Sequence, residues 1–338
     1  MPASLREINT LGLDVCCDEF LSISDKQELV NVCYETYHSD RAMLILGGGS
    51  NVVFSENFAG TVIQVDTKGI TQQEDAENVY LTVEAGENWH DLVKYCLAHG
   101  IYGIENLALI PGSVGAAPIQ NIGAYGVELA DVCHSVEFVD LDAGEMYEIS
   151  NQDCQFSYRE SIFKQQLRNK VLITAVTLKL SRCWKPNLSY VPLTSLNKET
   201  VDADMIVDLV CKTRASKLPD PRVLGNVGSF FKNPIIDTEK LKQLLTEFPN
   251  MVHYNLDNSQ HKLAAGWLID NAGLKGVCVG GACIHQQQAL VIVNNNSATG
   301  ADVCNLALKI IDEIEQRFDV QLEVEPRIIA EFGEVILS

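Results

Sequence analysis

One stretch decides how this chain is interpreted: Pro111-Gly112-Ser113-Val114-Gly115-Ala116-Ala117-Pro118-Ile119-Gln120-Asn121-Ile122-Gly123-Ala124-Tyr125-Gly126. It lies in a longer segment, residues 105–126, whose Gly, Pro, Ala and Asn content predicts one long loop. A loop of this length is usually either functional or disordered. The apolar residues inside it, such as Leu107 and Ile122, argue against disorder. Its small residues would let the backbone lie flat against a large planar ligand.

A second glycine-rich loop, Gly47-Gly48-Gly49-Ser50-Asn51, follows the apolar run 43–46. Glycines allow backbone N–H groups to approach and surround an anion. Taken alone, a tight turn between strands is the better interpretation of this loop. It is not a P-loop, because no Gly-Lys-Ser/Thr follows, and Val52 stands where a dinucleotide fingerprint has its third glycine. Two loops of this type in one region nevertheless favour a dinucleotide such as FAD.

The rest of the chain predicts an α+β fold, because its strands and helices do not alternate strictly. Strands are expected over 43–46, 61–65, 80–84, 136–139, 146–149, 171–180, 289–293 and 320–329. Helices are expected after a capping box at 24–27, from Asn88 to Leu97, and over 203–217, 239–248, 262–271 and 301–318. Pro219-Asp220-Pro221 ends one helix and indicates a domain boundary.

Charge and composition exclude several classes of protein. Lys and Arg number 25 against 45 Asp and Glu, so the net charge of −20 argues against general nucleic-acid binding. No run approaches the ~18 apolar residues of a membrane span, and the start lacks the pattern of a signal peptide, so we expect a soluble cytoplasmic protein without membrane insertion. The eleven cysteines include no C-x-x-C pair, which favours free buried thiols over a zinc site or disulfides, and the seven His suggest no metal cluster.

Three short motifs carry further candidate chemistry: Ser157-Tyr158-Arg159-Glu160-Ser161, Gly225-Asn226-Val227-Gly228-Ser229-Phe230-Phe231-Lys232-Asn233-Pro234 and Glu323-Val324-Glu325-Pro326-Arg327. Each has an ordinary alternative, respectively a surface strand, a simple loop and a solvated strand edge. In the second motif, flanking glycines would present Ser229 on a tight turn. In the third, strand alternation would place Glu323, Glu325 and Arg327 on one face.

In their order and residue sequence, these motifs resemble those of the UDP-N-acetylenolpyruvoylglucosamine reductase (MurB) family of peptidoglycan synthesis. The resemblance runs from Asn9-Thr10-Leu11-Gly12 to Gly333-Glu334 and is most specific in residues 105–129, 217–221, 228–234 and 262–270. It implies a vanillyl-alcohol-oxidase-like flavin fold of two FAD-binding subdomains, 1–66 and 67–218, with the PCMH-type FAD region at about 17–183. It also implies a substrate domain over 219–319 and a last strand, 320–338, that returns to the flavin region.

The resemblance further implies FAD as cofactor, NADPH as co-substrate and an enolpyruvyl UDP-sugar as substrate, bound by a monomer. The catalytic positions correspond to Arg159, Ser229 and Glu325. The positions that contact FAD correspond to Gly47, Gly48, Gly49, Ser50, Asn51, Pro111, Gly112, Ser113, Gly115, Ala116, Ile119, Asn121, Ile122, Gly123 and Arg214. The positions that hold the substrate correspond to Tyr125, Tyr190, Lys217, Asn233 and Gln288, with Tyr190 on a loop that closes over it.

The sequence departs from the family pattern at a few positions. Ala116 and Ala117 stand where relatives often have Ser, Gly48 where they often have Glu, and Pro326 follows Glu325 where proline often precedes the acid. Two rival hypotheses remain. A different flavin oxidoreductase of the same fold would need the FAD loops but not the catalytic set, and a regulatory nucleotide-binding protein would be expected to have lost one of its members.

Overall fold

The computed structural model describes residues 2–256 and 259–337. The chain divides into two compact units: unit 2 contains residues 19–48 and 60–216, and unit 1 contains residues 1–18, 49–59 and 217–338. Unit 1 resumes at 217, close to the boundary predicted at Pro219. The division of the flavin region into two subdomains stays a prediction.

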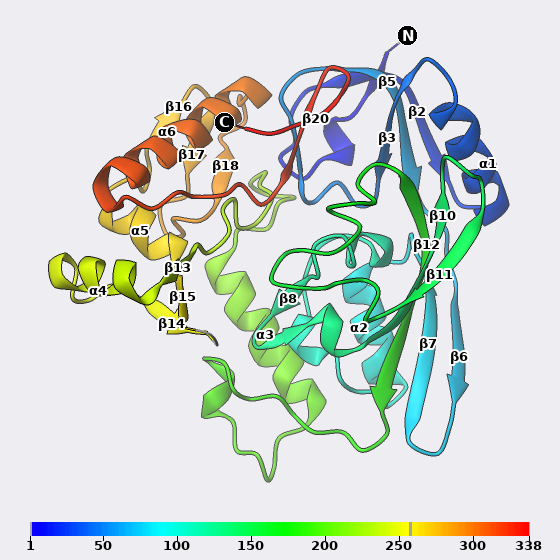
Figure 1. Cartoon of the computed structure of the whole chain (residues 1–338), viewed down its shortest axis with the longest axis horizontal. Helices are drawn as coiled ribbons and strands as arrows, with labels where there is room; N and C mark the ends of the chain where they lie inside the picture. Colours follow the sequence, from blue (N-terminus) through cyan, green and yellow to red (C-terminus); the bar gives the residue numbers. More distant parts are fainter. Residues whose placement is uncertain (1, 257–258, 338) are drawn as a thin grey trace. The chain divides into compact units, whose positions relative to one another are not determined.

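Unit 2 is built on a five-stranded antiparallel sheet in the order β11-β10-β12-β7-β6 (Figure 1). The strands are β11 (Met146–Ser150), β10 (Cys133–Asp140), β12 (Val171–Ser181), β7 (Asn78–Glu84) and β6 (Ile70–Glu74). The central strand β12 is almost continuously apolar and buried, whereas the edge strands β6 and β11 are mostly exposed. Polar edges discourage pairing with other chains, so the sequence of each strand matches its place in the sheet.

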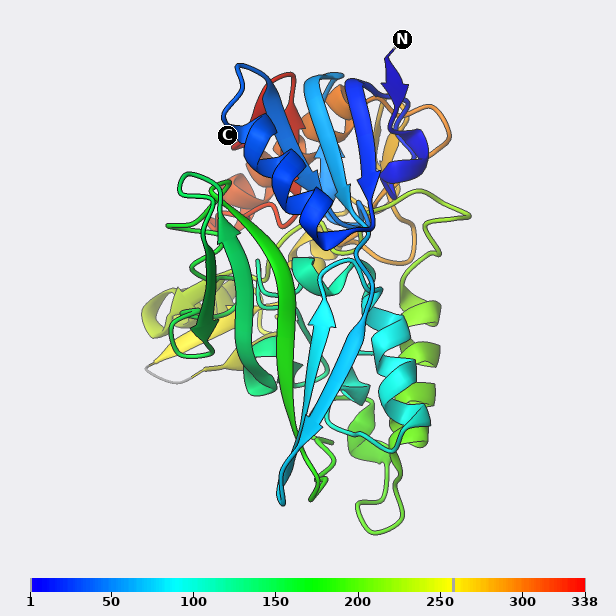
Figure 2. The ribbon, with the colours of Figure 1, turned by 90° about the vertical axis from the view of Figure 1, so that its right-hand side faces the viewer.

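Helices α2 (Trp89–Ala98) and α3 (Ala203–Lys217) lie on one face of this sheet (Figure 2). Their apolar residues share one core with Leu81, Val176 and Leu178 of the sheet. Helix α1 (Lys26–Tyr37) packs with β3 (Ala42–Leu46) and with residues of β5 (Phe58–Val65), in a second core that takes Val139 and Leu172 from the sheet. Val139 and Leu172 belong to this second core, whereas their neighbours Phe138 and Ile173 belong to the first. The reason is that successive side chains of a strand point to opposite faces of the sheet.

In unit 1, β1 (Ala3–Ser4) pairs antiparallel with Cys16 and Cys17 at the start of β2 (Cys16–Ile23). In unit 2, β3 pairs in parallel with residues 60–64 of β5. The predicted loop 105–126 contains 3₁₀ turns at Glu105–Leu107 and Val114–Ala116 and ends at β8 (Gly123–Ala124), which pairs with β9 (Val127–Glu128). A further 3₁₀ turn, Leu129–Asp131, leads into β10. The loop is ordered, as its apolar residues predict.

Among its described residues, unit 1 has three small three-stranded sheets and three α-helices. The sheets are β13 (Ile235–Asp237), β15 (Gln260–Leu263) and β14 (His253–Asn255); β16 (Cys278–Val279), β17 (Ala282–Ile284) and β18 (Ile292–Asn294); and β20 (Gly333–Val335), β19 (Arg327–Ala330) and β4 (Val52–Phe54). The helices are α4 (Thr238–Glu247), α5 (Ala265–Asn271) and α6 (Gly300–Phe318). Both units mix helices and strands, so the predicted α+β class is confirmed.

Four predicted elements of the sequence need correction. The helix expected over 262–271 begins only at Ala265, because 260–263 pairs with β13 and β14. The strand expected from Ala289 is restricted to 292–294, since 285–291 forms a turn closed by the His285 N–H and the Val291 carbonyl. Helix α1 is capped by Asp25, whose carboxylate accepts from the Glu28 N–H, and not by a box beginning at Ser24.

The fourth correction concerns the end of the chain, where one strand was expected over 320–329. Only Arg327–Ala330 is a strand, and it pairs in parallel with β4. Before it, the Lys232 N–H donates to the Glu323 carbonyl and the Glu325 N–H donates to the Phe230 carbonyl, both at 2.9 Å. Pro326 lies where the chain changes partners, and its missing N–H suits a position outside both ladders.

The expectation that every thiol is free was also wrong. Cys278 and Cys283 are joined in a disulfide and face each other across the β16–β17 hairpin. Their five-residue separation concealed the pairing, because the sequence did not reveal that a tight hairpin would bring them opposite each other. Nine cysteines are free, and most of them are buried.

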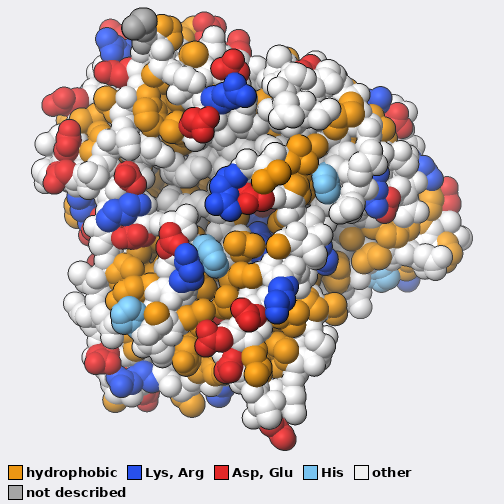
Figure 3. Space-filling view, turned by 180° about the vertical axis from the view of Figure 1, so that it is seen from behind, with side chains coloured by type: hydrophobic (Ala, Val, Ile, Leu, Met, Phe, Trp, Pro, Cys, Tyr) orange, Lys and Arg blue, Asp and Glu red, His pale blue; other side chains and the backbone are white. Residues whose placement is uncertain are grey.

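No described helix is both long and apolar enough to cross a membrane. On the face seen in Figure 3, basic side chains lie among acidic ones. Among the described residues, this face therefore lacks the continuous basic surface that nucleic-acid binding requires, in agreement with the net charge of −20.

Candidate functional site

The two glycine-rich loops meet in unit 2. A Cβ atom built on Gly47 would lie 2.3 Å from Ser113 Oγ, and one on Gly48 would lie 3.2 Å from Gly112 Cα. No side chain fits at Gly47 without displacing Ser113, so the two loops approach backbone to backbone. That is the arrangement expected of a cradle for a diphosphate.

The continuation of the first loop, Gly49 to Asn51, lies in unit 1. Gly49 adopts a φ of 62° and its absent Cβ would lie 1.8 Å from the Ile8 carbonyl oxygen, so only glycine fits. The Gly49 carbonyl accepts from the Thr10 N–H at 3.1 Å. The hydroxyl of Thr10 is buried and has no hydrogen-bond partner, which marks a polar atom next to this loop that a ligand could satisfy.

The other residues predicted to contact FAD are spread over loop 111–123. Pro111 is exposed, Gly112, Gly115 and Ala116 are half-buried, and Ile119 and Ile122 pack against the main core. Asn121 differs from these, because its side chain is fully buried and its polar atoms are bonded within the protein. A contact between Asn121 and a cofactor would therefore fall to its backbone.

Arg214 is a cation in unit 2 without a carboxylate partner among the described residues. Its Nε is buried and makes no hydrogen bond. Burial lowers the pKa of Arg214; Tyr125 and Cys211 partly offset this, and the charge of Arg159 lowers the pKa further. A guanidinium held in this way next to a second guanidinium is stabilised by a bound anion. Arg214 is thus suited to bind a negatively charged ligand such as a flavin nucleotide.

Tyr125 and Tyr190 lie edge to face, with ring centroids 5.9 Å apart. Tyr125 and Gly126 form the two-residue turn between β8 and β9, with φ values of 50° and 82°. Such turns usually have Asn, Asp or Gly at both positions, so a tyrosine here points to a role for its side chain. Burial raises the pKa of the Tyr125 hydroxyl, although Arg214 counteracts this.

The loop that carries Tyr190 is fixed to this turn by two asparagines that the sequence did not single out. Asn106 Nδ2 donates to the carbonyls of Tyr125 (2.9 Å) and Asn187 (3.0 Å). Asn187 Nδ2 donates to the Gly126 carbonyl at 2.8 Å. These side-chain-to-backbone contacts join residues up to 81 positions apart, and no local sequence pattern marks such partners.

Arg159 lies on a tight turn of unit 2 in which Ser157 and Glu160 exchange backbone hydrogen bonds of 3.1 Å each. Its φ is 58°, at the turn position where glycine or asparagine is usual. The guanidinium Nη2 donates to the Gly123 carbonyl at 3.0 Å, and Lys164 Nζ donates to the Arg159 carbonyl at 3.1 Å. The side chain is half-buried, so it is fixed and still accessible.

Ser229 and Glu325 are brought together in unit 1. The segments that carry them run antiparallel, bridged at Phe231 and Val324, and the Glu325 N–H donates to the Phe230 carbonyl. Ser229 follows Gly228, whose φ of 74° makes the turn and whose N–H donates to Asn226 Oδ1. Both functional side chains are half-buried. Arg159 belongs to unit 2.

Three predicted substrate residues lie in or at the edge of unit 1. Lys217 is the exposed last residue of α3. Asn233 Oδ1 accepts from the Ala265 N–H at 2.9 Å and so caps α5. Gln288 Oε1 would lie 3.8 Å from a Cβ built on Gly266 at the start of the same helix. Asn233 and Gln288 thus meet at the start of α5.

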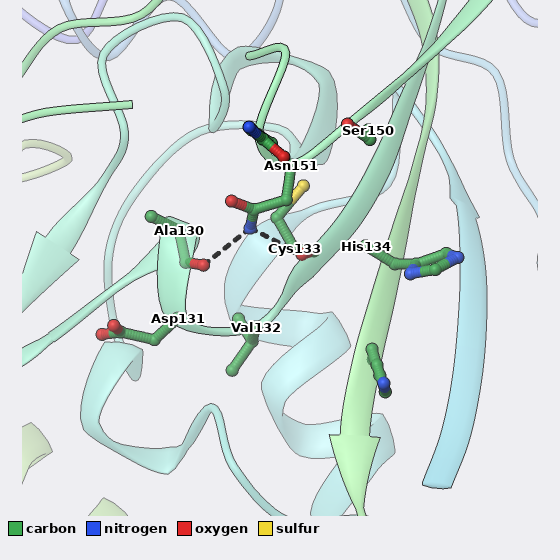
Figure 4. Close-up of a pocket in the computed structure, with 9 residues that line it drawn as sticks. Ala130, Asp131, Val132, Cys133, His134, Ser150 and Asn151 are labelled. Carbon is green, nitrogen blue, oxygen red and sulfur yellow. Dashed lines mark hydrogen bonds between the residues drawn. The ribbon is translucent and has the colours of Figure 1, made fainter. Parts of the chain in front are cut away.

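One pocket in unit 2 contains none of the predicted site residues. It encloses about 370 Å³ and is lined by residues 130–134, 150–152 and Lys179. Figure 4 shows that Asn151 donates from its side-chain amide to the carbonyls of Ala130 and Cys133, each at 2.7 Å. Asn151 therefore holds the start of β10 in place, which is a structural role.

Comparison with known proteins identifies both halves of the chain. Residues 19–150 match the family model of a FAD-binding domain, and residues 220–329 match the C-terminal domain of UDP-N-acetylenolpyruvoylglucosamine reductase. The first match confirms FAD as the cofactor and the FAD-binding type of fold.

Full-length relatives agree. A protein from Shewanella sediminis described as UDP-N-acetylenolpyruvoylglucosamine reductase is 54% identical to this chain, over 98% of this chain and 96% of that protein. A protein of the same description from Salmonella typhi is 49% identical, over 99% of this chain and 98% of that protein. The crystal structure of UDP-N-acetylenolpyruvylglucosamine reductase (MurB) from Thermus caldophilus superposes with a TM-score of 0.65 over 97% of this chain and 98% of that one, at 24% identity, which supports the fold. The chain belongs to the UDP-N-acetylenolpyruvoylglucosamine reductase family.

Proposed function

We propose that this chain reduces an enolpyruvyl UDP-N-acetylglucosamine with electrons from NADPH, as a cytoplasmic monomer in peptidoglycan synthesis. The observation that carries the proposal is that the antiparallel segments carrying Ser229 and Glu325 adjoin in unit 1, through the Phe231–Val324 bridge and the bond from the Glu325 N–H to the Phe230 carbonyl, in a family whose relatives are described as this reductase. The uncompensated Arg214 and the joined glycine loops in unit 2 support the binding of FAD. When bound, FAD supplies hydride transfer from NADPH to the substrate.

Three side chains manage charge and protons around that transfer. The double bond gains a hydride at its methylene carbon and a proton at the neighbouring carbon that bears the carboxylate. The Arg159 guanidinium stays charged and would bind the carboxylate, whose oxygens collect negative charge as the hydride arrives. The Ser229 hydroxyl would donate the proton, and the Glu325 carboxylate would orient this transfer.

The substrate's nucleotide end would be bound by the remaining residues. Lys217 offers a positive charge to the diphosphate, in a chain whose net charge is −20. Asn233 and Gln288 offer amides near the start of α5. Tyr125 and Tyr190 form an aromatic pair that would pack on the nucleotide or sugar and exclude water.

The decisive experiment is anaerobic stopped-flow absorbance of the flavin, with NADPH added first and the enolpyruvyl UDP-sugar second. We expect bleaching, followed by rapid return of the yellow colour when the sugar is added. Bleaching without recovery would move the chain to the rival class of flavin oxidoreductases. A protein that binds no flavin would overturn both assignments.

A further inference from the structure

Arg159 needs support from outside its own turn. Its left-handed conformation (φ 58°) is unfavourable for any residue with a Cβ. Two backbone hydrogen bonds between Ser157 and Glu160 close the turn, and Lys164 Nζ donates to the Arg159 carbonyl. A candidate catalytic side chain in a strained position persists when the surrounding structure fixes it. The relevant question is therefore which neighbour fixes this turn.

Asn121 is the buried neighbour that reaches the turn. Its Nδ2 donates to the Ser157 carbonyl at 3.1 Å and to Glu128 Oε2 at 2.8 Å, and its Oδ1 accepts from the Ala130 N–H at 2.9 Å. The Ser157 oxygen is the same atom that accepts from Glu160 to close the turn. Since the side chain is fully buried, water cannot replace these bonds without rearrangement.

Asn121 also fixes the other end of Arg159. The guanidinium donates to the carbonyl of Gly123, two residues further along the same loop. A Cβ on Gly123 would lie 2.8 Å from Glu128 Cγ and 3.4 Å from Arg159 Nη1, so the side chains of Glu128 and Arg159 both pack against this glycine. A displacement of Asn121 would move both the turn that carries Arg159 and the carbonyl that holds its side chain.

The point to which Asn121 is attached is itself immobilised. The Ala130 N–H donates to Asn121, and the Ala130 carbonyl accepts from Asn151 Nδ2, which also donates to the Cys133 carbonyl (Figure 4). The two amides therefore clamp Ala130 from both sides and connect the turn of Arg159 to β10. This connection is made entirely within unit 2.

We propose that Asn121 is a positioning residue for Arg159, which holds the guanidinium where it meets the substrate carboxylate. The proposal rests on the proposed function of Arg159. It assigns the Asn121 side chain to the geometry of the second half-reaction and leaves to its backbone any contact with the cofactor.

The first test is the variant Asn121→Gly, because glycine accepts the φ of 44° at this position while the amide is removed. Misplacement of a catalytic group by about 1 Å can cost about 100-fold in rate. We therefore expect the reoxidation of reduced flavin by the sugar to slow at least ~10-fold, and the Kd of the sugar, measured by calorimetry, to rise. Reduction of the flavin by NADPH should change far less. Equal slowing of both half-reactions would contradict the proposal.

A double-mutant cycle separates positioning from a general structural role. If Asn121 acts through Arg159, the variant Asn121→Gly/Arg159→Ala should reoxidise no more slowly than Arg159→Ala alone. Rate losses that simply multiply would overturn the proposal. The control is Asn296→Gly, which makes the same substitution at an exposed residue of unit 1 with a φ of 65°. It should leave both half-reactions unchanged.

The variant Asn121→Asp keeps the side-chain shape in case the glycine variant folds poorly. Its second oxygen would face Glu128 Oε2 and the Ser157 carbonyl in place of a donor, and adjacent carboxylates share a proton more readily as pH falls. Sugar-dependent reoxidation should recover towards low pH in this variant relative to the wild type, and an unchanged pH profile would contradict the proposal. A wild-type protein that the sugar cannot reoxidise would overturn the proposed function, and this inference with it.

Discussion

The Ser229 hydroxyl, a weak acid, is the proposed proton donor and lies on a turn that the surrounding backbone fixes. It is half-buried and follows a glycine of positive φ, and the buried Asn226 holds that glycine through its side-chain oxygen. The next residue is bound on both backbone atoms, since the Phe230 N–H donates to Leu290 and its carbonyl accepts from Glu325. The hydroxyl is therefore presented on a rigid turn, which a poor acid needs if it is to protonate a carbon.

We expect Ser229→Ala to slow reoxidation of the flavin by the sugar about 100-fold or more, because general acid catalysis is typically worth that much. Reduction by NADPH should be unaffected, since no proton from the substrate-side acid is needed in that step. Stopped-flow measurement of the two half-reactions checks this. Ser39→Ala, at an exposed hydroxyl after α1, serves as the control, and equal slowing of both steps in the Ser229 variant would refute the assignment.

Arg214 gives a second prediction at the scale of one residue. Arg214 is half-buried with a fully buried Nε, and a desolvated cation without a carboxylate partner among the described residues destabilises the protein until an anion binds. Arg214→Met should therefore raise the stability of the FAD-free protein, by about 1 kcal/mol, and weaken FAD binding. Thermal unfolding of the apoprotein and fluorescence titration with FAD measure the two effects. A less stable apoprotein would mean that Arg214 has a partner in the folded chain and serves structure instead.

At the scale of elements, local signals in the sequence proved reliable where the element makes its own contacts. Helix α2 begins at the cap predicted, with Asn88 accepting from the Asp91 N–H, and the hairpin of β10 and β11 closes around Asp142-Ala143-Gly144. Errors arose where distant pairing decided the outcome. Lys262 and Leu263 fall in the predicted helix 262–271 but pair with residues of 235–237 and 253–255, and tertiary context overrides local preference there.

The same distinction applies to the candidate site. The glycine loops and the turn of Ser229 could be predicted, because glycine marks unusual backbone locally. The unusual backbone at Arg159 and Tyr125 could not, since neither residue type indicates a positive φ. The asparagines that fix these turns were also missed, as their partners are backbone carbonyls of remote segments.

Helix α1 is attached to the sheet by an ion pair that should make stability depend on pH. Lys26 Nζ lies 2.7 Å from Glu137 Oε1 and 3.2 Å from Glu84 Oε1. Burial alone would raise the pKa of Glu137, but its hydrogen bonds to Lys26 and Thr174 outweigh this effect. The pKa of Glu137 is therefore lowered from its ordinary value of 4.5. For Lys26, burial alone would lower the pKa, but the two carboxylates outweigh this effect. The pKa of Lys26 is therefore raised from its ordinary value of 10.5.

A lowered carboxylate pKa stabilises the fold above the unfolded value, near 4.5, and this contribution is lost as pH falls through the folded value. Glu137→Gln should therefore cost about 1 kcal/mol at pH 7, a modest figure because the pair is about one-third exposed and partly screened. The difference from wild type should shrink below pH 4. Lys94→Gln, in a pair with Asp91 whose side chains are about twice as exposed, is the control. Urea unfolding at pH 7 and pH 3.5 measures both, and a pH-independent difference would show that the charge is not responsible.

At the scale of the whole molecule, unit 1 is assembled from three separate stretches of chain. β19 pairs in parallel with β4, and the Ser55 N–H donates to the Ile329 carbonyl at 2.8 Å. The first stretch contributes as well, because Asn294 Nδ2 donates to the Leu11 carbonyl and the Asn226 N–H donates to the Thr10 carbonyl, both at 2.9 Å. The predicted substrate domain, 219–319, is therefore only part of the compact unit that holds Ser229.

This architecture predicts that a fragment of residues 219–338 will not fold as the unit does in the intact chain. It lacks β4 and the Thr10–Leu11 segment, and each lost hydrogen bond removes about 1 kcal/mol from a total stability of only about 5–15 kcal/mol. Packing is lost too, because Gly300 at the start of α6 lies so close to the Phe54 carbonyl that a Cβ would approach it to 1.8 Å. Circular dichroism should show no cooperative thermal transition for the fragment, whereas the full chain should show one. A fragment that melted cooperatively near the temperature of the full chain would establish 219–338 as an independent domain, and would show that the contacts from residues 1–18 and 49–59 are dispensable.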